Sequence, residues 1–163
     1  MKIAIITDTH FGARKGADYI HNYFKKFYDN IFFPYLEKHN IDTIIHMGDV
    51  FDSRKSIDYQ SLEWSKRVMF EPLKKYKVYA ITGNHDAYYK NTNKVNSPEL
   101  LLKSYDNIVI YSNPTEINVG GLDILLLPWI NSENFKESKE FINKSKSKVV
   151  MGHLEINGFK ATR

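Results

Sequence analysis

The chain has 163 residues, with 23 Lys and Arg against 19 Asp and Glu, a net charge of +4, and no cysteine. This length suits one domain with a sizeable core, and the lack of cysteine excludes disulfide frameworks and thiolate metal sites. The longest apolar run, residues 124–129, is far shorter than the ~20 residues that cross a bilayer, and Met1 leads straight into a strand pattern instead of a signal peptide. We therefore expect a soluble, cytoplasmic protein without a membrane partner.

The order of apolar patterns predicts an α/β fold, with a mostly parallel, buried sheet flanked by helices. Strands are predicted at residues 3–6, 43–47, 78–81 and 148–151, where short β-branched runs are bounded by turn residues. Residues 115–127 alternate around Gly120-Gly121, which predicts an antiparallel hairpin in the same sheet. One domain is expected over residues 1–163.

Helices are predicted at residues 18–38, 57–75 and 132–147, and from residue 97 onward. Pro72 should bend or close the second helix, and Ser97 should cap the helix that continues with Pro98. The many aromatic residues of the first helix are assigned to the core in preference to a nucleotide-stacking surface. The face of this helix that should pack on the sheet consists of Ile20, Phe24, Phe27, Ile31 and Tyr35.

Each of the four predicted strands runs directly into polar residues that can bind a metal. Ligand sites form beyond the carboxyl ends of parallel strands, so these residues should meet at one edge of the sheet. An Asp-x-His after a single strand is usually an ordinary loop, but four such clusters at successive strand ends are hard to explain by chance. Three of them begin with glycine, which permits a close backbone approach. The clusters are Asp8-Thr9-His10, Gly48-Asp49, Gly83-Asn84-His85-Asp86 and Gly152-His153.

This mixture of residue types fits a two-metal hydrolytic site, which needs one carboxylate between the ions and neutral ligands that limit the negative charge. Asp49 is the natural bridge. His85 is not needed as a ligand, so it is free to protonate a leaving oxygen. The remaining ligands would be Asp8 with His10 for one ion and Asn84 with His153 for the other.

Four motifs of the chain resemble, in order, those of the calcineurin-like metallophosphoesterases. Their details look like the SbcD-type nucleases of double-strand-break repair, and residues 127–130, Leu-Pro-Trp-Ile, are most similar to the phage recombination endonuclease subunits of that family. Protein phosphatases of the superfamily carry Asp-Arg-Gly and Asn-His-Glu instead. The resemblance covers essentially the whole chain. The motifs are Asp8-Thr9-His10-Phe11-Gly12, Gly48-Asp49-Val50-Phe51-Asp52, Gly83-Asn84-His85-Asp86 and Gly152-His153.

The resemblance implies a metal-dependent exonuclease and endonuclease that acts on double-stranded DNA ends in recombination and repair, inside a bacterial or phage-infected cell. It implies two divalent ions, Mn2+ first and Mg2+ as the alternative. It further implies an SbcC-type ABC ATPase as partner and a homodimer formed through the helices of the front half. Its site residues are the ligands Asp8, His10, Asp49, Asn84 and His153, the catalytic acid His85, and Asp52, which would orient His85.

The chain departs from the family pattern after His153, where a Gly-His-x-His motif that supplies one histidine to each ion would follow. We therefore expect the C-terminal portion of the phosphoesterase domain to be missing from residues 1–163, and this stretch alone to have little or no activity. Two alternatives stay open. One is a phosphodiesterase or pyrophosphatase acting on nucleotides or lipid-linked sugars, and the other is a catalytically incomplete fragment or scaffold.

Further polar residues near the motifs have competing interpretations. His46 precedes Asp49 in a buried strand and is expected to be a hydrogen-bonded structural histidine, while His21 and His39 should lie outside the site. Basic and aromatic residues that follow the metal motifs would suit DNA, although a solvated surface has the same composition. These candidates for DNA contact are Arg14, Lys15, Arg54, Lys55, Tyr88, Tyr89, Lys90, Asn91 and Lys94.

Overall fold

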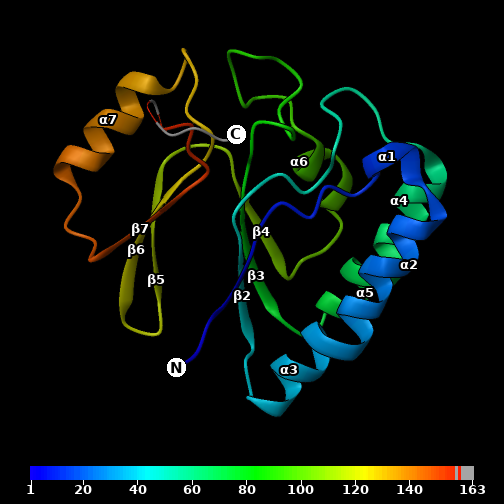
Figure 1. Ribbon diagram of the computed structural model, residues 1–163. Coiled ribbons are helices and arrows are strands. Elements are labelled where there is room, and N and C mark those ends of the chain that lie inside the picture. Colours follow the sequence, from blue (N-terminus) through cyan, green and yellow to red (C-terminus); the bar gives the residue numbers. More distant parts are fainter. Residues whose placement is uncertain (157, 159–163) are drawn as a thin grey trace.

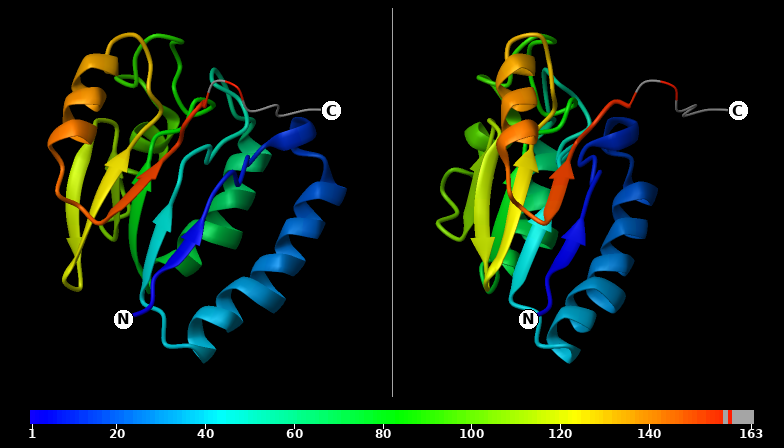
Figure 2. Two further views of the ribbon diagram at one scale, coloured as in Figure 1. Left: turned by 60° about the vertical axis from the view of Figure 1, so that its left-hand side comes forward. Right: turned by 90° about the vertical axis from the view of Figure 1, so that its left-hand side faces the viewer.

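The computed structural model describes residues 1–156 and 158 and has four layers (Figures 1 and 2). Helices α1 to α5 cover one face of a four-stranded sheet, a three-stranded sheet covers the other face, and helix α7 packs outside the second sheet. The predicted α/β architecture with a parallel, buried sheet is confirmed. None of the helices in the described residues combines the length and the apolar character that crossing a bilayer requires.

The first sheet is entirely parallel, in the order β1-β2-β3-β4. Its central strands are buried on both faces because helices cover one side and the second sheet covers the other, which explains their continuous apolar runs. Strand β4 is absent from the sequence prediction. The strands are β1 (Ala4–Ile6), β2 (Thr43–His46), β3 (Lys77–Ile81) and β4 (Ile108–Tyr111).

The second sheet corrects the prediction of one continuous sheet. Strands β5 (Thr115–Val119) and β6 (Leu122–Leu127) form the expected antiparallel hairpin, and Gly120 and Gly121 both have the positive φ that its two-residue turn requires. Strand β7 (Val149–Gly152) pairs in parallel with β6 instead of joining β1 to β3. Apolar periodicity shows that a strand is buried, but it does not show which sheet the strand joins.

Two long helical stretches pack against the first sheet, as predicted. In each stretch a turn of π-helix precedes an internal proline, Pro34 in the first and Pro72 in the second. Proline has no N–H to donate and would clash with the carbonyl four residues earlier in a regular α-helix. The wider π-turn accommodates it. After the short helix α1 (Ala13–Gly16), the first stretch is α2 (Asp18–Phe27), η1 (Tyr28–Phe32) and α3 (Phe33–Lys38). The second is α4 (Tyr59–Ser65), η2 (Lys66–Phe70) and α5 (Glu71–Leu73).

The predicted inward face of the first stretch is wrong over its second half. Phe27, Ile31 and Tyr35 are exposed, whereas Tyr28, Phe32 and Leu36 are buried. Aromatic and aliphatic residues occupy several phases of this helix, so their spacing alone selects no single face. The exposed residues form an aromatic stripe along the helix, which consists of Tyr19, Tyr23, Phe27, Ile31 and Tyr35.

The remaining helices lie near the ends of the strands. Helix α6 (Ser97–Leu102) is capped by Asn96, whose side chain accepts a hydrogen bond from the Glu99 N–H at 2.9 Å, and not by Ser97 as predicted. Helix α7 (Phe135–Lys144) is shorter at both ends than the predicted residues 132–147. One apolar core lies between the helices and the first sheet, and a second core lies between the two sheets.

Candidate metal centre

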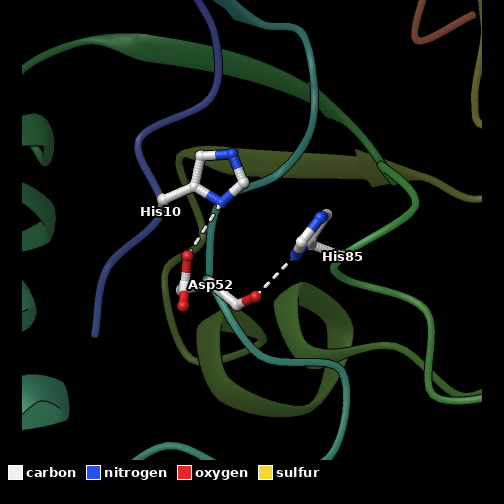
Figure 3. Close-up of side chains that lie close together, drawn as sticks. All are labelled: His10, Asp52 and His85. Atoms are coloured by element: carbon white, nitrogen blue, oxygen red, sulfur yellow. Dashed lines mark hydrogen bonds and ion pairs between the residues drawn. The ribbon is translucent and has the colours of Figure 1, made fainter. Parts of the chain in front are cut away.

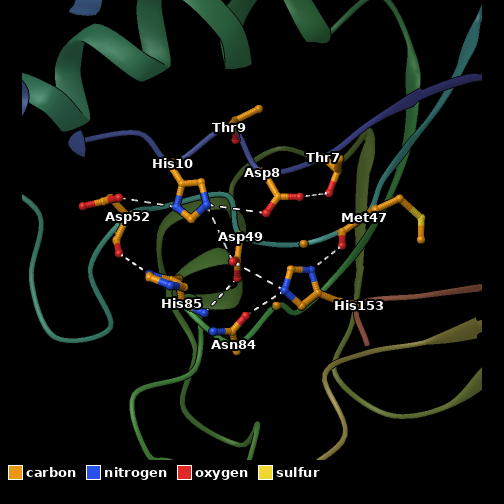
Figure 4. Close-up of polar contacts among 12 residues, drawn as sticks. Thr7, Asp8, Thr9, His10, Met47, Asp49, Asp52, Asn84, His85 and His153 are labelled. Carbon is orange, nitrogen blue, oxygen red and sulfur yellow. Dashed lines mark hydrogen bonds and ion pairs between the residues drawn. The ribbon is translucent and has the colours of Figure 1, made fainter. Parts of the chain in front are cut away.

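The loops that follow β1, β2, β3 and β7 converge at one end of the two sheets (Figures 1 and 4). The first two loops are joined by their backbones, because the Asp8 N–H donates to Gly48 O and the His10 N–H to Asp49 O, each at 3.1 Å. Asp8, His10 and Asp49 have φ angles of 52°, 41° and 53°. This left-handed region is uncommon for residues other than glycine, and such backbone conformations concentrate at functional sites.

Glycines allow the loops to approach this closely. A Cβ atom at Gly83 would lie 2.2 Å from Asp49 Oδ1, and a Cβ atom at Gly48 would lie 2.9 Å from the Gly83 nitrogen. Any side chain at either position would therefore push the second and third motifs apart. The predicted reason for glycine at the start of these two motifs is confirmed.

Asp49 stands between two groups of donor atoms (Figure 4). Its Oδ2 lies 3.7 Å from His10 Nε2 and 3.4 Å from His153 Nε2. Asp8 Oδ1 lies 3.5 Å from the same His10 nitrogen, and Asn84 Oδ1 lies 2.7 Å from the same His153 nitrogen. Donor atoms of Asp8, Asp49 and His153 lie within 4.8 Å of one another. Carboxylate oxygens and imidazole nitrogens at such spacing fit a divalent cation, so the five predicted ligands share one site.

The electrostatics of the site favour the charged forms of His153 and Asp49. Burial lowers the pKa of His153, but the hydrogen bond and negative charge of Asp49 outweigh it and raise this pKa to about 9. Burial also raises the pKa of Asp49, yet the hydrogen bonds from His153 and from the His85 N–H hold it below its usual value. A proton on His153 Nε2 thus occupies the direction in which a cation would be bound. Nδ1 of the same ring donates to Met47 O at 2.9 Å and so fixes the ring orientation.

His10, Asp52 and His85 form a second cluster beside the first (Figure 3). His85 Nδ1 donates to the main-chain carbonyl of Asp52 at 2.6 Å, while the Asp52 carboxylate lies 3.4 Å from His10 Nδ1. The two rings meet edge to face, with centroids 4.9 Å apart. Asp52 therefore holds His85 through its backbone and faces His10 with its side chain.

Asp86 is a residue of the site to which the sequence alone assigned no role. Its carboxylate is completely buried and accepts three backbone hydrogen bonds, from the Val50 and Phe51 N–H groups at 2.9 and 3.2 Å and from the Gly83 N–H at 2.9 Å. It thereby ties the loop of Asp49 to the loop of Asn84 and His85. Burial raises its pKa to about 6, and the charge of Asp49 adds to this effect. Its place at the end of the third motif was the available signal.

His46 is a structural histidine, as predicted. Its Nδ1 accepts the Gly48 N–H at 3.2 Å, so Nε2 carries the proton and donates to Thr9 Oγ1 at 3.1 Å. The Thr9 hydroxyl in turn donates to Val50 O. Burial lowers the pKa of His46 to about 4 and keeps the ring neutral. This chain of hydrogen bonds fixes the loop that carries Asp8 and His10. His21 is buried against Trp64, away from the donor groups.

The candidates for DNA contact fall into two classes. Arg54 is engaged inside the protein, because its guanidinium donates to Ala87 O at 3.1 Å and lies 4.9 Å from the ring centre of Trp129. Tyr88 is 40% exposed and packs edge to face on Tyr89. The other members have exposed side chains, and two of them, Arg14 and Lys15, adopt positive φ in α1. The exposed basic residues are Arg14, Lys15, Lys55, Lys90 and Lys94.

Comparison with known proteins shows what the chain is similar to. The family model described as calcineurin-like phosphoesterase matches residues 1–162. Exonuclease subunit 1 of enterobacteria phage T4 is 34% identical over 163 residues, which cover 98% of this chain and 47% of that protein. The chain thus spans about half the length of this curated relative. A solved structure of a protein of unknown function from Aquifex aeolicus matches with 20% identity and a TM-score of 0.48, over 96% of this chain and 80% of that one.

Proposed function

Since the chain belongs to the calcineurin-like phosphoesterase family, we propose that it is a metal-dependent nuclease that hydrolyses phosphodiester bonds at double-stranded DNA ends, with both exonuclease and endonuclease action, in recombination and break repair. The observation that carries this proposal is the position of Asp49, whose Oδ2 faces both His10 and His153. The name of the phage relative, an exonuclease subunit, favours a nuclease over a phosphatase.

Two divalent ions, Mn2+ in the first place with Mg2+ as the alternative, would polarise the phosphate as Lewis acids and lower the pKa of a water molecule. Asp49 would be a ligand of both ions. Its acidity fits the role, because its lowered pKa keeps the carboxylate charged. The neutral donors Asn84 and His10 limit the negative charge that the site concentrates. One ion would be held by Asp8, His10 and Asp49, and the other by Asp49, Asn84 and His153.

His85 is the general acid of the proposed reaction. Its Nδ1–H is committed to the Asp52 carbonyl, so Nε2 is the atom that delivers a proton to the leaving oxygen as the P–O bond breaks. The imidazolium is therefore the active form. Asp52 orients the ring, and the buried Asp86 holds the main chain on both sides of the site. His85 thus transfers the proton, while Asp52 and Asp86 position the His85 ring and the main chain around it.

The exposed residues that follow the metal motifs in the sequence would bind the DNA strand. We assign phosphate contacts to Arg14, Lys15, Lys55 and Lys90, since exposed cations suit a polyanion. Tyr88 would contact a base or sugar. Arg54 acts indirectly, because it holds the main chain at Ala87 and thus the segment that carries these contacts.

Two protein partners belong to the proposal. The phage relative is one subunit of an exonuclease, and this supports an SbcC-type ABC ATPase as the second subunit. The aromatic stripe supports a homodimer, because large side chains such as Tyr23 and Ile31 are 71% and 58% exposed and line one face of the helix. Ile31→Lys should convert the full-length dimer to a monomer in light scattering. Leu100→Lys, at an exposed aliphatic residue outside the stripe, should leave the dimer intact.

The metal roles are tested by Asp49→Ala and His85→Ala in the full-length protein. Asp49→Ala should remove both Mn2+ ions in calorimetry. His85→Ala should keep both ions and lose activity on linear duplex DNA by roughly 10²–10⁴-fold, the usual contribution of a general acid. His39→Ala, outside the site, is the control and should change neither. Equal metal loss in the first two variants would refute the role of His85, and hydrolysis of small diesters without cleavage of DNA would refute the nuclease.

A further inference from the structure

A small pocket of about 220 Å³ opens beside the proposed catalytic pair. One wall is formed by Phe51 of the second motif and by residues 53–57, which directly follow that motif. The other wall is formed by Tyr88 and by residues between 95 and 101, which follow the third motif. Ser53 follows directly on Asp52, whose main-chain carbonyl accepts the His85 Nδ1–H at 2.6 Å, so the Ser53 edge of the pocket lies beside His85. The pocket therefore lies next to the point where a scissile phosphate would be held.

Six of the twelve residues that line the pocket have apolar or aromatic side chains. Phe51 is buried, whereas Tyr88 and Leu100 are 40% and 71% exposed, so Phe51 lies at the bottom and the other two lie at the mouth. Ile57 and Leu101 complete the apolar walls. Pockets for drug-sized ligands have volumes of roughly 300–1,000 Å³. This smaller volume suits one flat ring system.

One hydrogen bond ties the first wall to the start of the second without a ligand, from the Arg54 guanidinium to Ala87 O at 3.1 Å. Within the second wall, the Tyr88 N–H donates to Val95 O at 2.9 Å. The Asn96 side chain donates to Asn93 O at 2.8 Å, and Asn93 donates to Trp129 O at 2.9 Å. Because these polar groups are already paired, the pocket is preformed and offers its ligand mainly apolar contact.

The chemistry around the mouth indicates what this ligand is. Lys55 lines the pocket and places a positive charge at its entrance, and the Ser53 and Ser56 side chains lie on the same wall. A molecule that combines a flat apolar ring with an attached phosphate matches both features. We propose that the pocket receives the nucleobase next to the scissile phosphate, an inference that rests on the proposed nuclease function.

Two properties of the nuclease follow. The base enters the pocket only after it leaves the helical stack. The free-energy cost of leaving the stack is smallest for an unpaired or mismatched base. Apolar walls and a tyrosine face do not read the hydrogen-bonding edge of a base, so all four bases should be accepted. The enzyme should therefore prefer frayed ends and show no sequence preference at this position.

The test compares binding of thymidine 5′-monophosphate and methyl phosphate to the full-length protein by calorimetry. Wild-type protein should bind the nucleotide at least roughly fivefold more tightly, the lower end of the effect of base–aromatic stacking. Val95→Trp fills the pocket and should abolish this difference, and Leu100→Ala, which removes an exposed side chain at the mouth, should reduce it. Val109→Trp, at an equally exposed valine on β4, is the matched control and should behave as wild type.

Equal affinity for the two phosphates in wild-type protein, or an undiminished preference in Val95→Trp and Leu100→Ala, would overturn the inference. Hydrolysis of thymidine 5′-(4-nitrophenyl phosphate) and methyl 4-nitrophenyl phosphate with Mn2+ separates this result from the proposed function. If both esters are cleaved at the same efficiency, the phosphodiesterase stands and the base pocket fails. If neither is cleaved while the binding difference persists, the pocket stands and the proposed reaction fails.

Discussion

Replacing Asp86 with asparagine should separate the stability of the protein from its activity. The carboxylate accepts the N–H groups of Val50 and Phe51 on Oδ1 and that of Gly83 on Oδ2. Asparagine has the same shape, so its oxygen can keep the first two bonds. Its NH2 group would then face the Gly83 N–H, and two buried donors would lack an acceptor. The loop that carries Asn84 and His85 should move away from Asp49.

The magnitude follows from the pKa of Asp86. A rise from 3.8 to about 6 corresponds to about 3 kcal/mol, at 1.36 kcal/mol per unit. The metal-free native state therefore binds this proton more tightly than the unfolded chain does. The stabilisation is fully present below pH 3.8 and is lost as the pH rises through 6. Asparagine has no such titration, so the stability of wild type relative to Asp86→Asn should fall by about 2–3 kcal/mol between pH 4 and pH 7.

Urea unfolding of both proteins in EDTA, at pH 4, 5, 6 and 7, measures this difference. With Mn2+ at pH 7, kcat of Asp86→Asn should fall roughly 10²-fold, since a displacement of about 1 Å at a catalytic group has that effect. Asp106→Asn, at an exposed aspartate, is the control for both assays. A stability difference that stays constant from pH 4 to pH 7 would show that the buried charge is compensated, and unchanged kcat would show that Asp86 does not position the loops.

Two further predictions concern the histidines. Because the pKa of His153 is raised to about 9, Mn2+ must displace a proton from this residue when it binds. The affinity of the protein for Mn2+, measured by calorimetry, should therefore rise about tenfold per pH unit from pH 7 to pH 9. An affinity independent of pH would contradict the assignment of His153 as a ligand. Because the pKa of His46 is lowered to about 4, this residue contributes stability above pH 6.5 that is lost as the pH falls through 4, about 3 kcal/mol in total. His46→Asn keeps an acceptor for the Gly48 N–H and should make the stability of the protein less dependent on pH, so the midpoint of acid unfolding followed by circular dichroism should change. An identical midpoint would show that His46 does not contribute to acid unfolding.

The local pattern of the sequence was sufficient to predict strands β1 to β3 of the parallel sheet, the two long helices and the convergence of four loops, but not strand β4. These features depend on the periodicity of apolar residues, on strand direction and on glycine where two backbones approach closely. Each of these properties can be recognised within a few residues of sequence. The buried, hydrogen-bonded state of His46 could be predicted for the same reason, since its strand is apolar on both faces.

Other features were decided by contacts between distant segments. Strand β7 has the same apolar pattern as β1 to β3, but it pairs with β6. Strand β6 is the hairpin strand whose second edge is open for a parallel partner. The exposed aromatic stripe arises because Tyr28, Phe32 and Leu36 fill the space against the sheet and leave the neighbouring phase of the helix outside. The residues that converge on the candidate metal centre could therefore be predicted from sequence. How they are held depends on the tertiary fold, since two hydrogen bonds of Asp86 join residues 35 and 36 positions apart and no local pattern contains such a pairing.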